Sequence, residues 1–269
     1  MLATTWRIAV NVFRESVRDK VLYNLVFFAI LLIAASLLLG QLTAGQEVKI
    51  IKDLGLAATS LFGLFIAVFI GIGLVSKEVE RRSVYALLAK PITRSQFVVA
   101  KYLGLVLTLA VNVAVMAVAL GLVLLYMDRT TSDAVRSVWE APALDPALLI
   151  AIFLIFVELA LITGLAIFFS TFSSPLLSAA LTFGLYVVGH FNADLRNFEQ
   201  VVDSAVVAWI ARVLYYVLPN LSPFDVKAQV VHGQAVALGY VGLTTAYGVA
   251  YIGVLLVAAV WIFSRRDFK

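Results

Sequence analysis

Long apolar runs separated by short polar connections dominate this chain and predict membrane-spanning helices. A helix needs about 20 apolar residues to cross the hydrocarbon core of a bilayer. Five runs reach that length, and a sixth, shorter run can also cross if neighbouring helices cover its ends. The six predicted spans are 22–42, 56–75, 102–127, 147–170, 176–191 and 241–263.

The first 21 residues have a different pattern, in which apolar residues recur every three or four positions and arginines point elsewhere. Such an amphipathic helix lies in the plane of the membrane interface, with its apolar face at the headgroup boundary. We therefore expect an interfacial helix over residues 1–21. Its expected apolar face consists of Trp6, Val10, Phe13, Val17 and Val21.

Composition agrees with a membrane protein. Hydrophobic residues make up 63% of the 269 positions and charged residues 13%, and the mean hydropathy is +1.03. A soluble domain would carry about a quarter charged residues. The basic residues cluster at the flanks of the spans, which argues against a nucleic-acid partner. The chain has no cysteine and only two histidines, so we expect no disulfide and no metal site.

The distribution of Lys and Arg predicts the topology. Basic residues are enriched on the cytoplasmic side of membrane proteins, and an even number of spans places both basic termini there. The segment 201–218 is ambiguous, because it is apolar enough to span but carries Asp203 and Arg212. As a seventh span it would put Arg265 and Arg266 outside. We therefore predict one all-α membrane domain over 1–269 with six spans, and an external segment 192–240 in which 201–218 lies on or dips into the outer leaflet.

The connection between the second and third spans, residues 76–101, is the most informative stretch. Six of the chain's 20 Lys and Arg residues lie in it. Pro91 ends a first helix, because the residue before a proline is pushed out of the helical region. Thr93 and Gln96 then form a capping box that starts a second helix. The pattern predicts a helical hairpin on the cytoplasmic side.

Three short motifs in this hairpin resemble a known family. They are Glu78-Val-Glu80-Arg81-Arg82-Ser83, Leu87-Leu88-Ala-Lys90-Pro91-Ile-Thr93-Arg94 and Lys101-Tyr-Leu-Gly104, with Phe97 between the last two. This pattern resembles the signature segment of permease subunits of type-2 ABC transporters. The whole chain is most similar to the branch that includes the permease for nitrous-oxide-reductase maturation.

The resemblance implies a function in transport. The hairpin would seat in a groove of a separate ATP-binding subunit of a bacterial inner-membrane exporter, and a second permease copy would complete the membrane portion. Both termini would be cytoplasmic, and ATP and magnesium would belong to the partner subunit. The implied coupling residues are Glu78, Glu80, Arg81, Arg82, Lys90, Pro91, Thr93, Arg94 and Phe97. The alternative, that these charges only fix topology, leaves Pro91 and the capping box unexplained.

The chain has no Gly-x-x-x-x-Gly-Lys-Ser/Thr phosphate loop. We therefore expect a non-catalytic subunit that holds no cofactor and depends on another chain for ATP hydrolysis.

Glu158 lies in the middle of the fourth span, where an ionised carboxylate is costly. It either lines the translocation path or a dimer interface, or it makes a helix-packing hydrogen bond to a group such as Asn112 or Thr163. His190, near the outer end of the short fifth span, is expected to be a satisfied interfacial residue. Gly71, Gly73 and the pair Gly239 and Gly242 are expected to allow close helix approach or bending.

Other functions stay open at this stage. An ATP-independent secondary transporter or channel would need several charged or broken-helix sites near the midplane, and only Glu158 qualifies. A membrane enzyme would need clustered acids or histidines at a membrane edge, whereas the external acids are scattered. A membrane assembly scaffold that carries no solute is a further alternative. The sequence leaves the substrate and the direction of transport open.

Overall fold

A computed structural model describes residues 2–42, 45–80, 93–191, 209, 212, 215 and 218–265, with the backbone alone for 2, 3 and 74–80. Every regular element in these residues is helical, which confirms the all-α fold. The elements are α1 (Leu2–Val17), α2 (Lys20–Gln41), α3 (Glu47–Glu80), α5 (Arg94–Thr130), α6 (Asp133–Arg136), α7 (Ala147–Ser170), α8 (Pro175–His190), a 3-10 turn (Ser222–Phe224), α11 (Lys227–Val231) and α12 (Leu238–Arg265).

The predicted spans appear as helices. In the part of the chain that is described, α2, α3, α5, α7 and α12 are long and apolar enough to cross a membrane, and α8 is a shorter apolar helix of 16 residues. Several helices exceed the apolar runs that predicted them. With 37 residues, α5 is about 55 Å long at the helical rise, well beyond the roughly 30 Å hydrocarbon core. Its ends must therefore extend into the polar layers on both sides.

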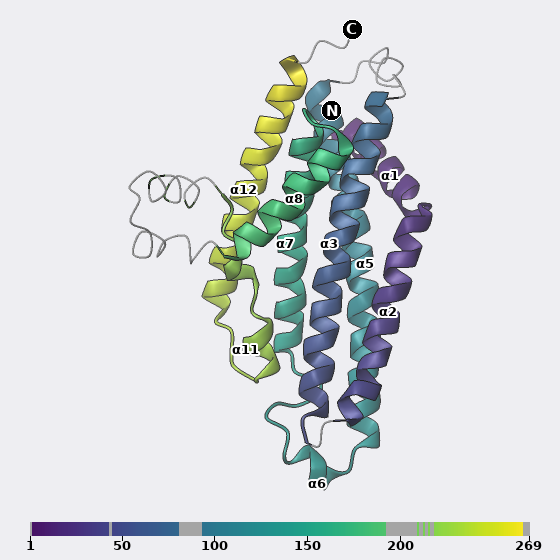
Figure 1. Ribbon diagram of the computed structural model, residues 1–269, viewed down its shortest axis with the longest axis vertical. Helices are drawn as coiled ribbons and strands as arrows, with labels where there is room; N and C mark the ends of the chain where they lie inside the picture. The colour runs from purple at the N-terminus through teal and green to yellow at the C-terminus, as the bar shows by residue number, and fades with distance from the viewer. Residues whose placement is uncertain are drawn as a thin grey trace.

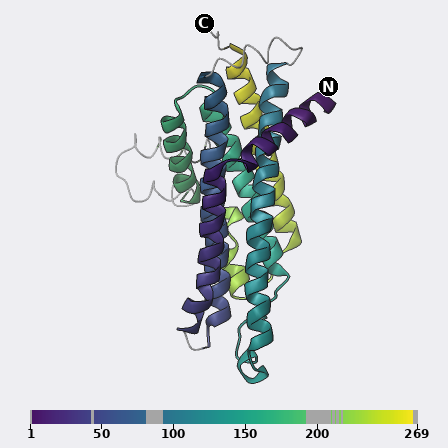
Figure 2. The ribbon, with the colours of Figure 1, turned by 90° about the vertical axis from the view of Figure 1, so that its right-hand side faces the viewer.

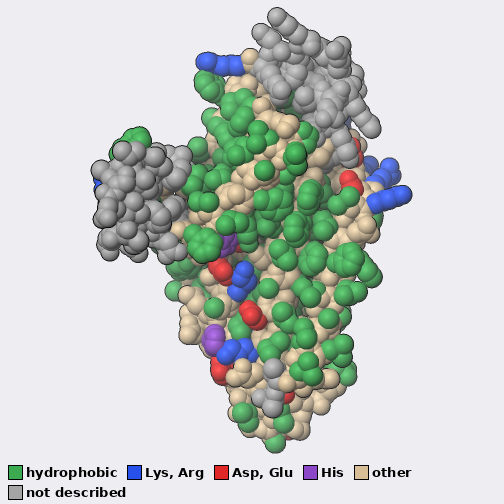
Figure 3. All heavy atoms as spheres, viewed as in Figure 1, with side chains coloured by type: hydrophobic (Ala, Val, Ile, Leu, Met, Phe, Trp, Pro, Cys, Tyr) green, Lys and Arg blue, Asp and Glu red, His purple; other side chains and the backbone are tan. Residues whose placement is uncertain are grey.

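Helices α3 and α7 form the centre of the bundle. They pack against each other, and α2, α5, α8 and α12 surround them (Figure 1). Most side chains of α3 and α7 in their spanning windows are buried, whereas most of those on α2 and α12 are exposed. Because these exposed side chains are mainly apolar (Figure 3), they form the surface that faces lipid.

The amphipathic helix α1 lies obliquely across α5 (Figure 2). It contacts α5 through Ala9 and Val12, both nearly fully buried. Gly104 makes this crossing close, since a Cβ there would lie 2.5 Å from the backbone oxygen of Ala9. Trp6, on the expected apolar face, is 58% exposed. The helix packs on the bundle through one stripe and leaves part of the neighbouring apolar stripe open. Its position at the membrane interface stays a prediction.

The two ends of the bundle carry different elements. The end of α3, the start of α5, the end of α12 and the turn between α7 and α8 gather at one end, which we call the hairpin end (Figure 1). The α2–α3 connection, α6 and α11 lie toward the opposite end. Helix α8 runs from the hairpin end and stops part-way along α7. Of the ambiguous segment 201–218, only residues 209, 212, 215 and 218 are described, so its position stays a prediction.

Candidate functional site

The predicted coupling hairpin is described at its two bases. Helix α3 continues through Glu80, so the backbones of Glu78 and Glu80 are helical. Arg81, Arg82, Lys90 and Pro91 lie outside the described residues. The helix–turn–helix between the two bases therefore stays a prediction.

The start of α5 confirms the capping box. The backbone N–H of Thr93 donates to Oε1 of Gln96 at 3.1 Å, and the N–H of Gln96 donates to Oγ1 of Thr93 at 3.3 Å. Thr93 has extended backbone angles of φ −76° and ψ 149°. These reciprocal bonds satisfy donors that the first turn of a helix leaves without partners. They fix Arg94 as the first helical residue.

Arg94 and Phe97, two of the predicted coupling residues, contact the end of α12. The Nη1 atom of Arg94 donates to the backbone oxygens of Phe263, at 3.0 Å, and Ser264, at 2.7 Å. The rings of Phe97 and Phe263 are stacked, with centroids 5.8 Å apart and planes 15° apart. The structure therefore brings the base of the hairpin onto the last helix, a contact that the sequence did not indicate.

Glu158 lies inside the bundle and pairs with His190. Its side chain is 1% exposed, and Oε1 lies 3.2 Å from Nε2 of His190, the last residue of α8. This is ion-pair distance, although the alignment is too poor for a hydrogen bond. The expected partners Asn112 and Thr163 were wrong, because each bonds a carbonyl of its own helix, at Thr108 and Leu159 respectively. Their positions on α5 and α7 let them satisfy themselves locally.

The hydrogen bonds of His190 fix where a proton must lie. Its Nδ1 is 3.0 Å from the carbonyl oxygen of Tyr186, and a carbonyl only accepts, so Nδ1 carries the hydrogen. Nε2 then faces the carboxyl group of Glu158. The two side chains therefore meet at ion-pair distance inside the bundle.

A returning segment of chain caps the end of α8 beside this pair. The N–H of Leu221 donates to the carbonyl of Gly189 at 2.9 Å, and Oγ of Ser222 donates to the carbonyl of His190 at 2.8 Å. These carbonyls lie in the last turn of α8, where carbonyl groups find no N–H donor within the helix. Lys227 and Asp225 form an ion pair at 3.6 Å a few residues later. His190 is satisfied as expected, because its carbonyl is capped by Ser222 and its Nδ1 bonds the carbonyl of Tyr186. Its position at the membrane interface stays a prediction.

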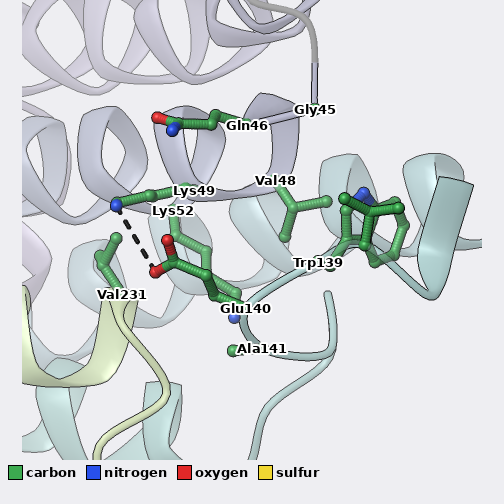
Figure 4. A pocket seen from close by; sticks show the side chains of 10 residues that line it. Gly45, Gln46, Val48, Lys49, Lys52, Trp139, Glu140, Ala141 and Val231 are labelled. Carbon is green, nitrogen blue, oxygen red and sulfur yellow. Dashed lines mark ion pairs between the residues drawn. The ribbon is translucent and has the colours of Figure 1, made fainter.

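The far end of the bundle holds a cavity of about 260 Å³ between the N-terminus of α3 and the loop before α7 (Figure 4). Oε2 of Glu140 lies 3.5 Å from Nζ of Lys49 and 3.1 Å from Nδ1 of His232. The hydrogen bond from His232, with the nearby Lys49 charge, lowers the pKa of Glu140 below its ordinary value. Lys52 is fully buried and donates to the carbonyl of Pro142 at 2.8 Å.

These contacts hold elements together and do not converge on one ligand. Figure 4 shows the side chains of Lys49 and Trp139 at opposite sides of the cavity. The ammonium group of Lys52 already donates to the carbonyl of Pro142 in the loop. Within the described ranges, no group of three or more His, Asp or Glu side chains gathers where it could bind a metal. Lys52 went unnoticed in the sequence because nothing local distinguishes a buried lysine from an exposed one. Tyr186 and His190 carry a signal in retrospect, since they are four residues apart on one helix face.

The chain is thus a bundle of apolar helices with a capped helical base at one end. No curated protein matches the chain. A protein-family model described as ABC-2 family transporter protein matches residues 6–268, nearly the whole chain. The match includes most of α1, all the long helices and the hairpin. The chain belongs to the ABC-2 family of membrane transporter proteins.

Proposed function

We propose that this chain is the permease subunit of a bacterial ABC exporter, in which a separate ATP-binding subunit drives movement of a substrate across the inner membrane. The observation that carries the proposal is the capped start of α5, which supports the hairpin on a defined helix end. A capped helix pair transmits a rotation, whereas a flexible loop absorbs it. The hairpin motifs and the family membership support the same role.

On this proposal the hairpin end faces the cytoplasm, together with both termini. The ATP-binding subunit docks at the hairpin, and ATP and magnesium stay on that subunit. A second permease copy completes the membrane portion. The polar pair Glu158 and His190 then lies within the membrane, where it favours one arrangement of α7 and α8 over others.

A second candidate is an ATP-independent transporter. One observation favours it: α8 ends part-way along α7 (Figure 1) beside the buried Glu158, and broken helices next to buried charges are typical of secondary transporters. The two functions differ in the need for a partner. Only the exporter requires a bound ATPase for movement of solute.

The test is co-purification from native membranes. A tagged wild-type chain is expected to carry an ATP-binding subunit, and Mg²⁺-dependent ATP hydrolysis should accompany it. Glu80→Arg or Arg82→Glu should remove the ATPase, because each reverses a charge in the hairpin. Arg129→Glu, an exposed arginine at the other end of α5, serves as the matched control and should retain it. A wild-type chain that binds no ATPase would exclude the exporter and leave the second candidate.

A further inference from the structure

The base of the hairpin is joined to α12 at one defined place. Arg94 is the first residue of α5, directly after the segment that carries the coupling motifs. Its guanidinium donates to the carbonyls of Phe263 and Ser264, 169 and 170 residues further along the chain. The last carbonyls of a helix have no partners within it, and a cation there also meets the negative end of the helix dipole. The contact therefore ties the end of α12 to the first turn of α5.

An aromatic layer lies beneath the polar contact. Phe97 stacks on Phe263, which is 2% exposed, and the ammonium group of Lys101 lies 5.0 Å above the ring of Phe97. Arg94, Phe97 and Lys101 are three and four residues apart, so they share one face of α5. Two adjoining layers, one polar and one aromatic, resist both sliding and separation.

The other part of α12 holds the segment that caps α8. The N–H of Asn220 donates to the hydroxyl oxygen of Tyr247, and the hydroxyl of Tyr240 donates to the carbonyl of Pro223, each at 2.8 Å. The same segment donates from Ser222 to the carbonyl of His190, whose ring faces Glu158. A continuous set of contacts thus runs from the hairpin base along α12 to the buried polar pair.

We propose that Arg94, with Phe97 and Phe263, is a strut that passes hairpin movement to α12, and through α12 to the end of α8. This rests on the proposed function, because the movement comes from the ATP-binding subunit. Arg94 is then a positioning residue inside the permease. A docking residue, in contrast, would bind the ATPase directly, and its loss would release the ATPase.

The two roles are separated by binding and movement measured on the same complex. The chain has no native cysteine, so single cysteines can be introduced without other changes. Spin labels at Val257 on α12 and Leu176 on α8, which are 71% and 83% exposed, report the distance between these helices. The complex is compared without nucleotide and after trapping with ATP, magnesium and vanadate.

In wild type the distance is expected to shift on trapping. Arg94→Ala should abolish the shift while the ATPase stays bound and hydrolyses ATP. Arg94→Lys should restore part of the shift, because its ammonium group can donate to the same carbonyls. Phe263→Leu, which keeps the backbone acceptors but removes the ring stack, should reduce the shift. Arg129→Ala, at the far end of α5, should behave as wild type.

Three results would overturn the strut. One is an unchanged shift in both Arg94→Ala and Phe263→Leu. Another is release of the ATPase by Arg94→Ala, which would make Arg94 a docking residue. The third is a wild-type complex in which α12 does not move on trapping. A wild-type chain that binds no ATPase at all is a separate result, since it refutes the proposed function itself.

Discussion

The pairing of Glu158 with His190 predicts strong energetic coupling between α7 and α8. Where Glu158 and His190 are both ionised, charges 3.2 Å apart attract by roughly 5 kcal/mol at an effective dielectric constant of about 20, and desolvation offsets much of this. Removing one partner of a buried pair costs about 3–5 kcal/mol, because the other is left uncompensated. Glu158→Gln and His190→Gln should each lower the free energy of unfolding by an amount of that order.

The double variant distinguishes a true pair from two independent losses. With both groups replaced, no buried charge is left without a partner, so the loss should be clearly smaller than the sum of the single losses. Coupling energies between contacting residues reach about 0.5–3 kcal/mol, and we expect a value near the top of that range. Unfolding is followed by tryptophan fluorescence as a denaturing detergent is titrated into mixed micelles at constant pH.

Thr163→Val is the matched control for this cycle. Thr163 is equally buried on α7, but its hydroxyl donates to a carbonyl of its own helix. Its replacement should cost about 1 kcal/mol and should add independently to His190→Gln. If the effects of Glu158→Gln and His190→Gln were additive to within about 0.5 kcal/mol, the two side chains would not interact and the proposed coupling of α7 and α8 would be refuted.

Three further predictions concern close contacts and pH. Gly104→Ala should lower the stability of the purified chain by about 1–3 kcal/mol, because its Cβ would lie 2.5 Å from α1, whereas Gly121→Ala on the same helix meets open space. Gly189→Ala should lower stability similarly, since its Cβ would come within 2.8 Å of the segment that caps α8, while Gly184→Ala should have little effect. The lowered pKa of Glu140 contributes stability above the ordinary carboxyl pKa near 4.5 that is lost as pH falls through the folded pKa. Melting curves of wild type and Glu140→Gln should therefore differ at neutral pH and converge in acid, and a difference that did not shrink as the pH fell below the ordinary carboxyl pKa would contradict this.

The spans and the start of α5 could be predicted because each depends on neighbouring residues alone. The length of an apolar run is a property of the sequence, and α7 begins and ends where its run does. The capping box needs only Thr93 and a residue three positions later. Helix α3 was less well predicted at its start, since the first nine residues of Glu47–Glu80 include Lys49, Lys52 and Asp53. The bundle buries Lys52 there, and a hydropathy pattern cannot anticipate that.

Contacts between helices could not be predicted, because they depend on which faces meet. Gly71 was expected at a close approach, and a Cβ there would lie 3.2 Å from Ala166, in agreement. Gly73, Gly239 and Gly242 were also expected to allow close approach or bending, and a Cβ on any of them would meet open space, so none of them lies at a close approach. The closest approaches between helices occur at other glycines. The partner of Glu158 was also missed, because it lies on a helix whose register against α7 is set by packing.

The burial of α12 explains why this helix suits a moving part. Helices α3 and α7 are largely enclosed, so displacing either would break many packing contacts at once. Helix α12 packs along α7 through one narrow face and exposes most of its side chains, Trp261 and Val254 among them, to lipid. Lipid tails are as apolar as the protein interior, so sliding this surface through lipid costs little. A helix that is weakly packed along its length yet held by polar bonds near both ends can shift as a unit, with the α3–α7 core as a fixed frame.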